Sequence, residues 1–289
     1  MKLTTLLLLG IGAMSLWANN VNMKLDRTTT VEALGACQGV SYINGKAYLY
    51  GDREAGVIRE YNVQPDSLAY TNREVQLTVN GKDVINHPTG IAYNGKGPAF
   101  IGNSIRLNKE GTAWKAVIYA VDWEGLLKKG TLDGNLLKVI EDDACIQGTR
   151  PEYVTYQNKL YVATADYGNK ANEVRLYDPK ALLQASKTSE KGVLYKKFTC
   201  GPWVQNIHFI PEKDMLVLIQ NQIEGRKWRF TYLDLSKSLE QGRQEVIKVI
   251  DVDKEDELEG FALLESLDKG IAVTSSRKAN AHFISLTWQ

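Results

Sequence analysis

The chain has 289 residues, of which 44% are hydrophobic and 24% charged, and its formal net charge is +1. These proportions are typical of a globular protein and exclude a disordered, collagen-like or acidic-tail protein. Because 35 basic residues nearly balance 34 acidic ones, the chain lacks the overall positive field of a protein that holds nucleic acid through its phosphates. We therefore expect no nucleic-acid partner.

Residues 1–18 have the pattern of a signal peptide. Lys2 supplies a positive charge, residues 6–11 form an apolar run, and Ser15 and Ala18 each offer a small residue at a cleavage point. The apolar run is too short to cross a membrane, and no later segment is apolar over a sufficient length. We expect a mature protein of residues 19–289 that is secreted or periplasmic, has no membrane span and is a monomer.

A repeat of 51 to 63 residues fills the rest of the chain. Its five units begin at Gln38, Thr89, Glu152, Gln205 and Glu259. Each unit starts with two alternating strands, which tight turns at Asn44-Gly45 and Asn94-Gly95 join in the first two units. A third alternating run follows in every unit and a fourth in four of them. This period suits a four-stranded propeller blade.

The sequence therefore predicts one all-β domain, a five-bladed β-propeller. The expected blades cover residues 38–80, 89–141, 152–199, 205–252 and 259–288. The last blade lacks a fourth strand, and we expect residues 28–34 to supply it and close the ring. Six blades are an alternative, because the second interval is longer and holds a polar, helix-like segment at 124–135. A β-sandwich is a second alternative.

The first residue of every unit is polar. Because side chains alternate between the two faces of a strand, this residue is on the same face as the apolar, packed residues two and four positions later. In a propeller, the loops that enter the first strand and leave the second converge on the mouth of the central channel. We therefore expect Gln38, Thr89, Glu152, Gln205 and Glu259 around the axis. The converging loops add Asp52, Arg53, His87, Asn103, Arg150, Asp166, Tyr167, Trp203, Asn221, Glu257, Ser275 and Arg277. This set predicts a pocket for a small polar ligand; the alternative is a mouth that is merely hydrated.

Glu152 and Glu259 are the candidate catalytic residues. Two carboxyl groups near an axis repel each other and raise a pKa, which suits acid or base catalysis. Equally, they can share a cation such as Ca²⁺ with nearby amide and hydroxyl oxygens. The sequence leaves both roles open, and it contains no G-x-S-x-G or Walker-type motif that would indicate a serine hydrolase or a P-loop enzyme.

Three cysteines, Cys37, Cys145 and Cys200, each precede the first strand of a blade. Their spacing matches no zinc site. Since the third and fourth blades are neighbours, we predict a Cys145–Cys200 disulfide, with three packed thiols as the alternative.

Short segments resemble three families of five-bladed propellers. Residues 42–61, YINGKAYLYGDREAGVIREY, resemble the first blade of exported calcium-activated nucleotidases (apyrases). That resemblance implies an axial Ca²⁺ held by one residue of each blade, with Glu152 and Glu259 matching the family's residue type. Residues 150–165, RPEYVTYQNKLYVATA, are similar to the segment that carries the catalytic acid of arabinanase-type glycoside hydrolases, which implies Glu152 as the acid. Residues 37–42, CQGVSY, resemble a first-blade motif of glutaminyl cyclases.

These observations predict an exported propeller that binds and hydrolyses a small polar molecule, a sugar or a phosphate ester, in an axial pocket. Arg53, Arg150 and Arg277 would hold its anionic or hydroxylated groups. The alternative is a non-catalytic propeller whose loops bind a protein or a glycan.

Overall fold

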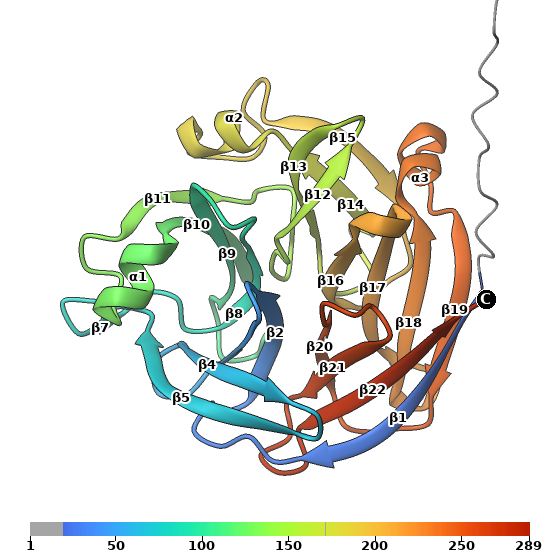
Figure 1. Cartoon of the computed structure of the whole chain (residues 1–289). Coiled ribbons are helices and arrows are strands. Elements are labelled where there is room, and N and C mark those ends of the chain that lie inside the picture. The colour runs from blue at the N-terminus through green and yellow to red at the C-terminus, as the bar shows by residue number, and fades with distance from the viewer. Residues whose placement is uncertain (1–19, 171) are drawn as a thin grey trace, which may run out of the picture.

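The computed structural model describes residues 20–170 and 172–289. It contains five four-stranded sheets arranged around a central axis (Figure 1). The prediction of an all-β, five-bladed propeller is confirmed, and the six-bladed and sandwich alternatives are wrong. The predicted signal peptide lies outside the described residues. Within the described ranges, no helix is long and apolar enough to cross a membrane.

All five sheets are antiparallel, with the first strand of each unit at the axis. The first blade comprises β2 (Cys37–Ile43), β3 (Lys46–Gly51), β4 (Val57–Gln64) and β5 (Ser67–Gln76). The second comprises β8 (Pro88–Ala92), β9 (Pro98–Arg106), β10 (Trp114–Asp122) and β11 (Leu136–Glu141). The third comprises β12 (Glu152–Tyr156), β13 (Lys159–Ala165), β14 (Glu173–Tyr177) and β15 (Leu194–Thr199). The fourth comprises β16 (Val204–Ile210), β17 (Met215–Ile223), β18 (Lys227–Asp234) and β19 (Val246–Val252).

The fifth blade is built from both ends of the described chain. It comprises β20 (Leu258–Leu263), β21 (Lys269–Thr274), β22 (Ala281–Trp288) and β1 (Val21–Thr29). An N-terminal strand thus closes the ring as predicted, but its position was wrong: the paired residues are Val21–Thr29 and not 28–34. Residues 30–34 form the crossing to the first blade, where the Asn280 side chain bonds the backbone N–H and C=O of Val31 at 2.7 and 2.9 Å. The apolar Val31 and Leu34, which suggested a strand, are buried as loop residues.

The core lies between the blades, where the faces of neighbouring sheets pack on each other. Between the fourth and fifth blades, Phe230 and Phe261 meet edge to face with ring centroids 5.4 Å apart. The hairpin turn at Asn44-Gly45 forms as predicted, with φ of 49° and 79°. The second hairpin differs, because the five residues 93–97 connect β8 to β9 instead of a two-residue turn at Asn94-Gly95.

Three short helices lie at the outer rim (Figure 1). They are α1 (Trp123–Lys129), α2 (Pro179–Gln184) and α3 (Leu235–Gln241), and each follows the third strand of its blade. An aspartate caps the N-terminus of each by accepting backbone N–H bonds: Asp122, Asp178 and Asp234. After each helix, one residue pairs with the fourth strand of the preceding blade, in the bridges Gln76–Thr131, Glu141–Lys187 and Thr199–Arg243. These bridges tie the first four blades together.

Smaller elements complete the description. A two-stranded hairpin, β6 (Thr78–Val79) and β7 (Lys82–Asp83), connects the first and second blades. Two 3₁₀ turns, η1 (Pro211–Lys213) and η2 (Glu224–Arg226), flank β17.

A buried histidine lies at the seam that closes the ring. The Nδ1 atom of His282 in β22 is 2.9 Å from the hydroxyl of Thr28 in β1, and its ring meets Trp228 edge to face at 4.9 Å. Burial, with a smaller contribution from the positive charge of Lys254 and an opposing one from Asp256, lowers the pKa of His282 to about 4. The imidazole is therefore neutral in the folded protein at neutral pH.

We predict that His282 makes the stability of the ring sensitive to acid. An imidazole whose pKa is lowered on folding stabilises the protein above its unfolded pKa, and this stabilisation is lost as the pH falls through that value. The stability advantage of wild type over His282→Gln should shrink by on the order of 1–3 kcal/mol between about pH 7 and about pH 4.5, measured by urea unfolding at each pH. A difference that stays constant with pH would contradict this role.

Candidate functional site

Four of the five predicted axial residues occupy β-bulges. The ladder between the first and second strands is interrupted at Gln38, Thr89, Gln205 and Glu259. A bulge places two residues opposite one, which bends the strand and re-aims the extra side chain. Gln38, Gln205 and Glu259 line a cavity at the mouth of the propeller. Thr89 is buried instead, and its hydroxyl donates to the carbonyl of Thr149.

Glu152 has a different place. It pairs with Ala163 in a ladder that runs without a shift to the turn after Tyr156. In strand register, Glu152 is equivalent to the residue that follows the bulge in each of the other blades. These residues are Gly39, Gly90, Asn206 and Gly260. The repeat alignment from sequence is therefore displaced by one residue in the third blade.

This second ring of positions lies where the strands approach most closely. A Cβ atom on Gly39 would be 2.2 Å from the hydroxyl of Tyr50, and one on Gly260 would be 2.8 Å from the Cα of Gly39. The fully buried Tyr50 reaches from the first blade to the fourth, where the Asn206 amide donates to its hydroxyl at 2.9 Å. Burial raises the pKa of Glu152 well above its usual range. Glu152 thus lies at the axis with its surface partly exposed, and the residues lining the cavity include Glu259 but not Glu152.

The cavity at the mouth, hereafter the axial cavity, has a volume of about 460 Å³. Every blade contributes to its wall. The lining residues are Ala36, Gln38, Asp52, His87, Ser104, Arg106, Trp114, Gln147, Arg150, Tyr167, Gln205, Gln222, Glu257, Glu259 and Ser275. Nine of the residues predicted at the mouth are among them: Gln38, Asp52, His87, Arg150, Tyr167, Gln205, Glu257, Glu259 and Ser275.

The remaining predicted residues lie elsewhere. Two of them hold the loops that form the mouth: Asn103 accepts the backbone N–H of His87 at 3.0 Å, and Asp166 accepts that of Gln147 at 2.7 Å. Arg53, Trp203 and Asn221 line neighbouring hollows. Thr89 is buried, Glu152 lies at the axis but does not line the cavity, and Arg277 is exposed outside the cavity.

Arg150 is the buried cation of the axial cavity, with 2% of its surface exposed. Its Nε and Nη2 atoms donate to the backbone and side-chain oxygens of Gln205, both at 3.2 Å, and the guanidinium lies 5.3 Å from the ring centre of Tyr167. The third nitrogen, Nη1, has no hydrogen-bond partner among the described residues. Although burial lowers the pKa of Arg150, with Asp166 and Glu259 opposing that shift, an arginine stays charged in proteins. The structure thus leaves a positive charge beside the cavity, with one donor that no described residue accepts.

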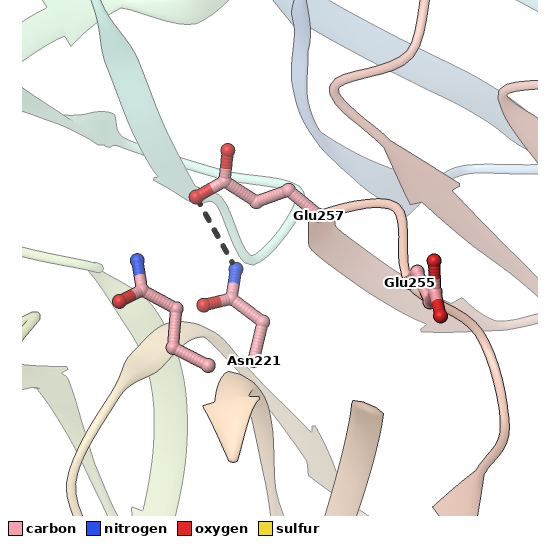
Figure 2. Close-up of a pocket in the computed structure, with 4 residues that line it drawn as sticks. Asn221, Glu255 and Glu257 are labelled. Carbon is pink, nitrogen blue, oxygen red and sulfur yellow. Dashed lines mark hydrogen bonds between the residues drawn. The ribbon is translucent and has the colours of Figure 1, made fainter. Parts of the chain in front are cut away.

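Two carboxyl groups meet beside this arginine. Glu257 accepts hydrogen bonds from the amides of Gln205 at 3.1 Å and Asn221 at 3.5 Å, and from the hydroxyl of Ser275 at 3.4 Å. Figure 2 shows the Asn221 amide directed at Glu257. Burial and the adjacent Glu257 raise the pKa of Glu259 well above its usual range, while Arg150 opposes this in part. The raised pKa favours the protonated form of Glu259, the form that can donate a proton within the cavity.

A further carboxyl group faces the cavity from the first blade. One oxygen of Asp52 accepts the backbone N–H of Ala36 at 2.8 Å, and the other is 3.5 Å from Nδ1 of His87. The charge of Asp52 adds to the rise in the pKa of Glu259. The cavity thus combines a proton donor, a second carboxyl group and a fixed cation.

The predicted calcium site stays a prediction. In residues 20–170 and 172–289, no group of three or more His, Cys, Asp or Glu side chains could hold a metal ion. Around Glu257 and Glu259, protein amides, a hydroxyl and the Arg150 guanidinium supply the donors and the positive charge themselves.

All three cysteines lie in the described part of the chain and are free thiols there. The structure therefore does not form the predicted Cys145–Cys200 disulfide. Cys145 is buried beside Arg175, whose Nη1 lies 3.6 Å from its sulfur. Burial raises the pKa of Cys37 to about 12 and that of Cys145 well above its usual range, so both behave as packed, unreactive thiols.

Sequence reasoning missed part of the wall of the axial cavity. Ser104, Arg106 and Trp114 lie at the end of β9 and the start of β10, around the insertion 107–113 that lengthens the second repeat. The long interval was the signal that could have pointed to them, because an insertion beside the mouth changes its wall.

Known proteins assign the chain to no family. No family model and no curated protein sequence matches the chain. A solved structure of hydrazine synthase from Kuenenia stuttgartiensis aligns with 84% of this chain at a TM-score of 0.45 and 11% sequence identity. The aligned part spans 57% of that chain. A likeness this distant carries no functional inference, and the resemblances to nucleotidases, arabinanases and glutaminyl cyclases stay predictions.

We predict that the raised pKa of Glu259 is visible in stability. A carboxyl group whose pKa is raised on folding contributes stability at low pH, and this contribution is lost as the pH rises through the folded pKa. Compared with Glu259→Gln, which keeps the shape of the neutral acid, the wild type should become progressively less stable from about pH 5 to about pH 9 in urea unfolding. Parallel stability curves for the two proteins would show that Glu259 ionises normally.

Proposed function

We propose that the chain binds a sugar in the axial cavity. The observation that carries this proposal is the buried Arg150, with its unused Nη1 donor, beside Glu259, whose raised pKa favours the protonated form. Around them the wall alternates hydrogen-bond donors and acceptors, including Gln38, Ser104 and Ser275. Sugar hydroxyls both donate and accept, so such a mixed wall can satisfy them from several directions.

The charges around the cavity favour a sugar over a phosphate ester. A phosphate monoester carries a charge of about −1.5 to −2 at neutral pH. Such a group would meet Arg150 and Arg106 but also face the carboxylates of Asp52 and Glu257. Repulsion from these two carboxylates offsets the attraction of the arginines. A neutral, hydroxylated ligand meets no such repulsion.

We further propose that the bound sugar is hydrolysed. Glycoside hydrolysis uses one protonated and one ionised carboxyl group at the scissile bond. Glu259 supplies the proton donor, and Asp52, held by Ala36 and His87, supplies the second carboxyl group. The proton donor is therefore Glu259 and not Glu152, which does not line the cavity.

Removal of residues 1–18 and export belong to the same proposal and rest on the sequence pattern alone.

Calorimetric titration of the mature chain with neutral sugars and sugar phosphates tests this proposal. We expect a neutral sugar to bind, and Arg150→Gln to weaken its binding by at least about 10-fold, because the fixed cation and its free donor are lost. Glu259→Gln should retain binding but lose release of reducing sugar by at least about 100-fold. Arg243→Gln is the matched control, since the side chain of Arg243 is 70% exposed at the rim.

Circular dichroism at the assay temperature verifies that each variant is folded. Binding of sugar phosphates alone, or of no sugar at all, would contradict the proposal. Sugar binding without any hydrolysis would leave a glycan-binding propeller and remove the catalytic part.

A further inference from the structure

We propose that the axial cavity is the middle of a groove that holds an oligosaccharide, with a second sugar site beside Trp114. This inference rests on the proposed function and specifies its ligand as a chain of sugars. Its basis is that three hollows adjoin one another across the mouth and share lining residues, with an aromatic wall between two of them.

The first neighbouring hollow lies between the first and second blades and has a volume of about 400 Å³. It shares Asp52, His87, Ser104, Arg106 and Trp114 with the axial cavity, so the two spaces adjoin each other. We call it the blade-two hollow. Its other lining residues are Arg53, Glu54, Asp83 and Asn86.

The second neighbouring hollow lies on the other side of the axis, between the fourth and fifth blades (Figure 2). It has a volume of about 280 Å³, is lined by Asn221, Gln222, Glu255 and Glu257, and shares Gln222 and Glu257 with the axial cavity. Sites for small molecules usually measure about 300–1,000 Å³. Three adjoining spaces of this size exceed what one sugar ring fills, and two of them flank the axial cavity that Arg150 lines.

Trp114 forms the wall shared by the axial cavity and the blade-two hollow. Its indole N–H donates to the carbonyl of Gly111 at 2.7 Å, which fixes the ring, and the Arg106 guanidinium lies 4.9 Å from the ring centre. The side chain is only half-buried. An indole that is held in place and partly exposed offers a flat apolar surface, against which the C–H face of a sugar ring can pack.

The polar groups of the blade-two hollow suit a neutral sugar. The Arg53 guanidinium forms an ion pair with Glu74 at 2.5 Å and donates to the carbonyl of Ala33 at 3.0 Å. Its positive charge is therefore already paired within the protein. Glu54 and Asn86 can accept hydrogen bonds from hydroxyl groups, whereas Asp83 already accepts the backbone N–H groups of Gly56 and Val84. A ligand that passes from Arg150 into this hollow moves alongside Asp52, which lines both spaces.

The test compares matched mono- and tetrasaccharides by calorimetry, with the Glu259→Gln protein to prevent cleavage. The probes are xylose and xylotetraose, glucose and cellotetraose, arabinose and arabinotetraose, and mannose and mannotetraose. For the sugar that binds, we expect the tetrasaccharide to bind at least about 10-fold more tightly than the monosaccharide. Adding Trp114→Ala should reduce that gain, the ratio of the two affinities, to about threefold or less.

Two further variants separate stacking from folding. Trp114→Phe keeps an aromatic face and should retain most of the gain. Trp288→Ala is the matched control, because the Trp288 indole also donates to a backbone carbonyl, that of Leu267 at 2.9 Å, but lies in β22 and lines none of the three hollows. It should leave both affinities unchanged.

Each outcome has a definite reading. Equal affinity for the monosaccharide and the tetrasaccharide would overturn the groove while leaving the proposed function intact. A gain that survives Trp114→Ala, or a Trp114→Ala loss that is equal for both ligands, would overturn the second sugar site. Failure of every probe to bind would instead overturn the proposed function itself.

Discussion

The close approach of the five inner strands at the axis is the constraint on which the rest of the molecule depends. Two of these strands pass so near each other that a side chain on Gly260 would overlap the backbone of Gly39. Tyr50 and Asn206 fill the remaining space and bond across the axis. Just before these crowded positions, four strands bulge, and Gln38, Gln205 and Glu259 turn into the mouth. A packed axis below and a polar cavity above are thus consequences of one geometry.

Closure of the ring holds this geometry fixed. Segments that follow α1, α2 and α3 bridge the first four blades, and β1 completes the fifth blade beside β22. The mouth loops are secured in turn by side chains at the ends of the second strands, such as Asp52, Asn103 and Asp166. A rigid scaffold that presents loops with polar side chains is the usual basis of a binding site. Here the scaffold holds the Arg150 guanidinium and the Glu259 carboxyl group in the wall of one cavity.

Much of this architecture could be predicted from the sequence, because a repeat of hairpins reveals blades without any knowledge of their packing. The mouth residues followed from the same repeat, as Arg150 and Glu259 show. The strand register could not be predicted from the repeat. A polar residue begins each repeat, but only the strand pairing shows that Glu152 is displaced by one position. This displacement changes where its side chain lies. The closing strand was also misplaced, since Val31 and Leu34 are apolar for packing in a loop and not for a strand. Trp114 was missed because an insertion has no counterpart in the other repeats.

The central claim is that the mouth of the propeller binds a sugar chain between Arg150 and Trp114. A crystal structure of the Glu259→Gln protein soaked with the tightest-binding tetrasaccharide tests it most directly. We expect sugar density in the axial cavity, with a sugar oxygen hydrogen-bonded to the Arg150 guanidinium and a second ring against the indole of Trp114. Density confined to the outer rim, or a mouth that stays free of sugar while the chain binds it in solution, would contradict the account.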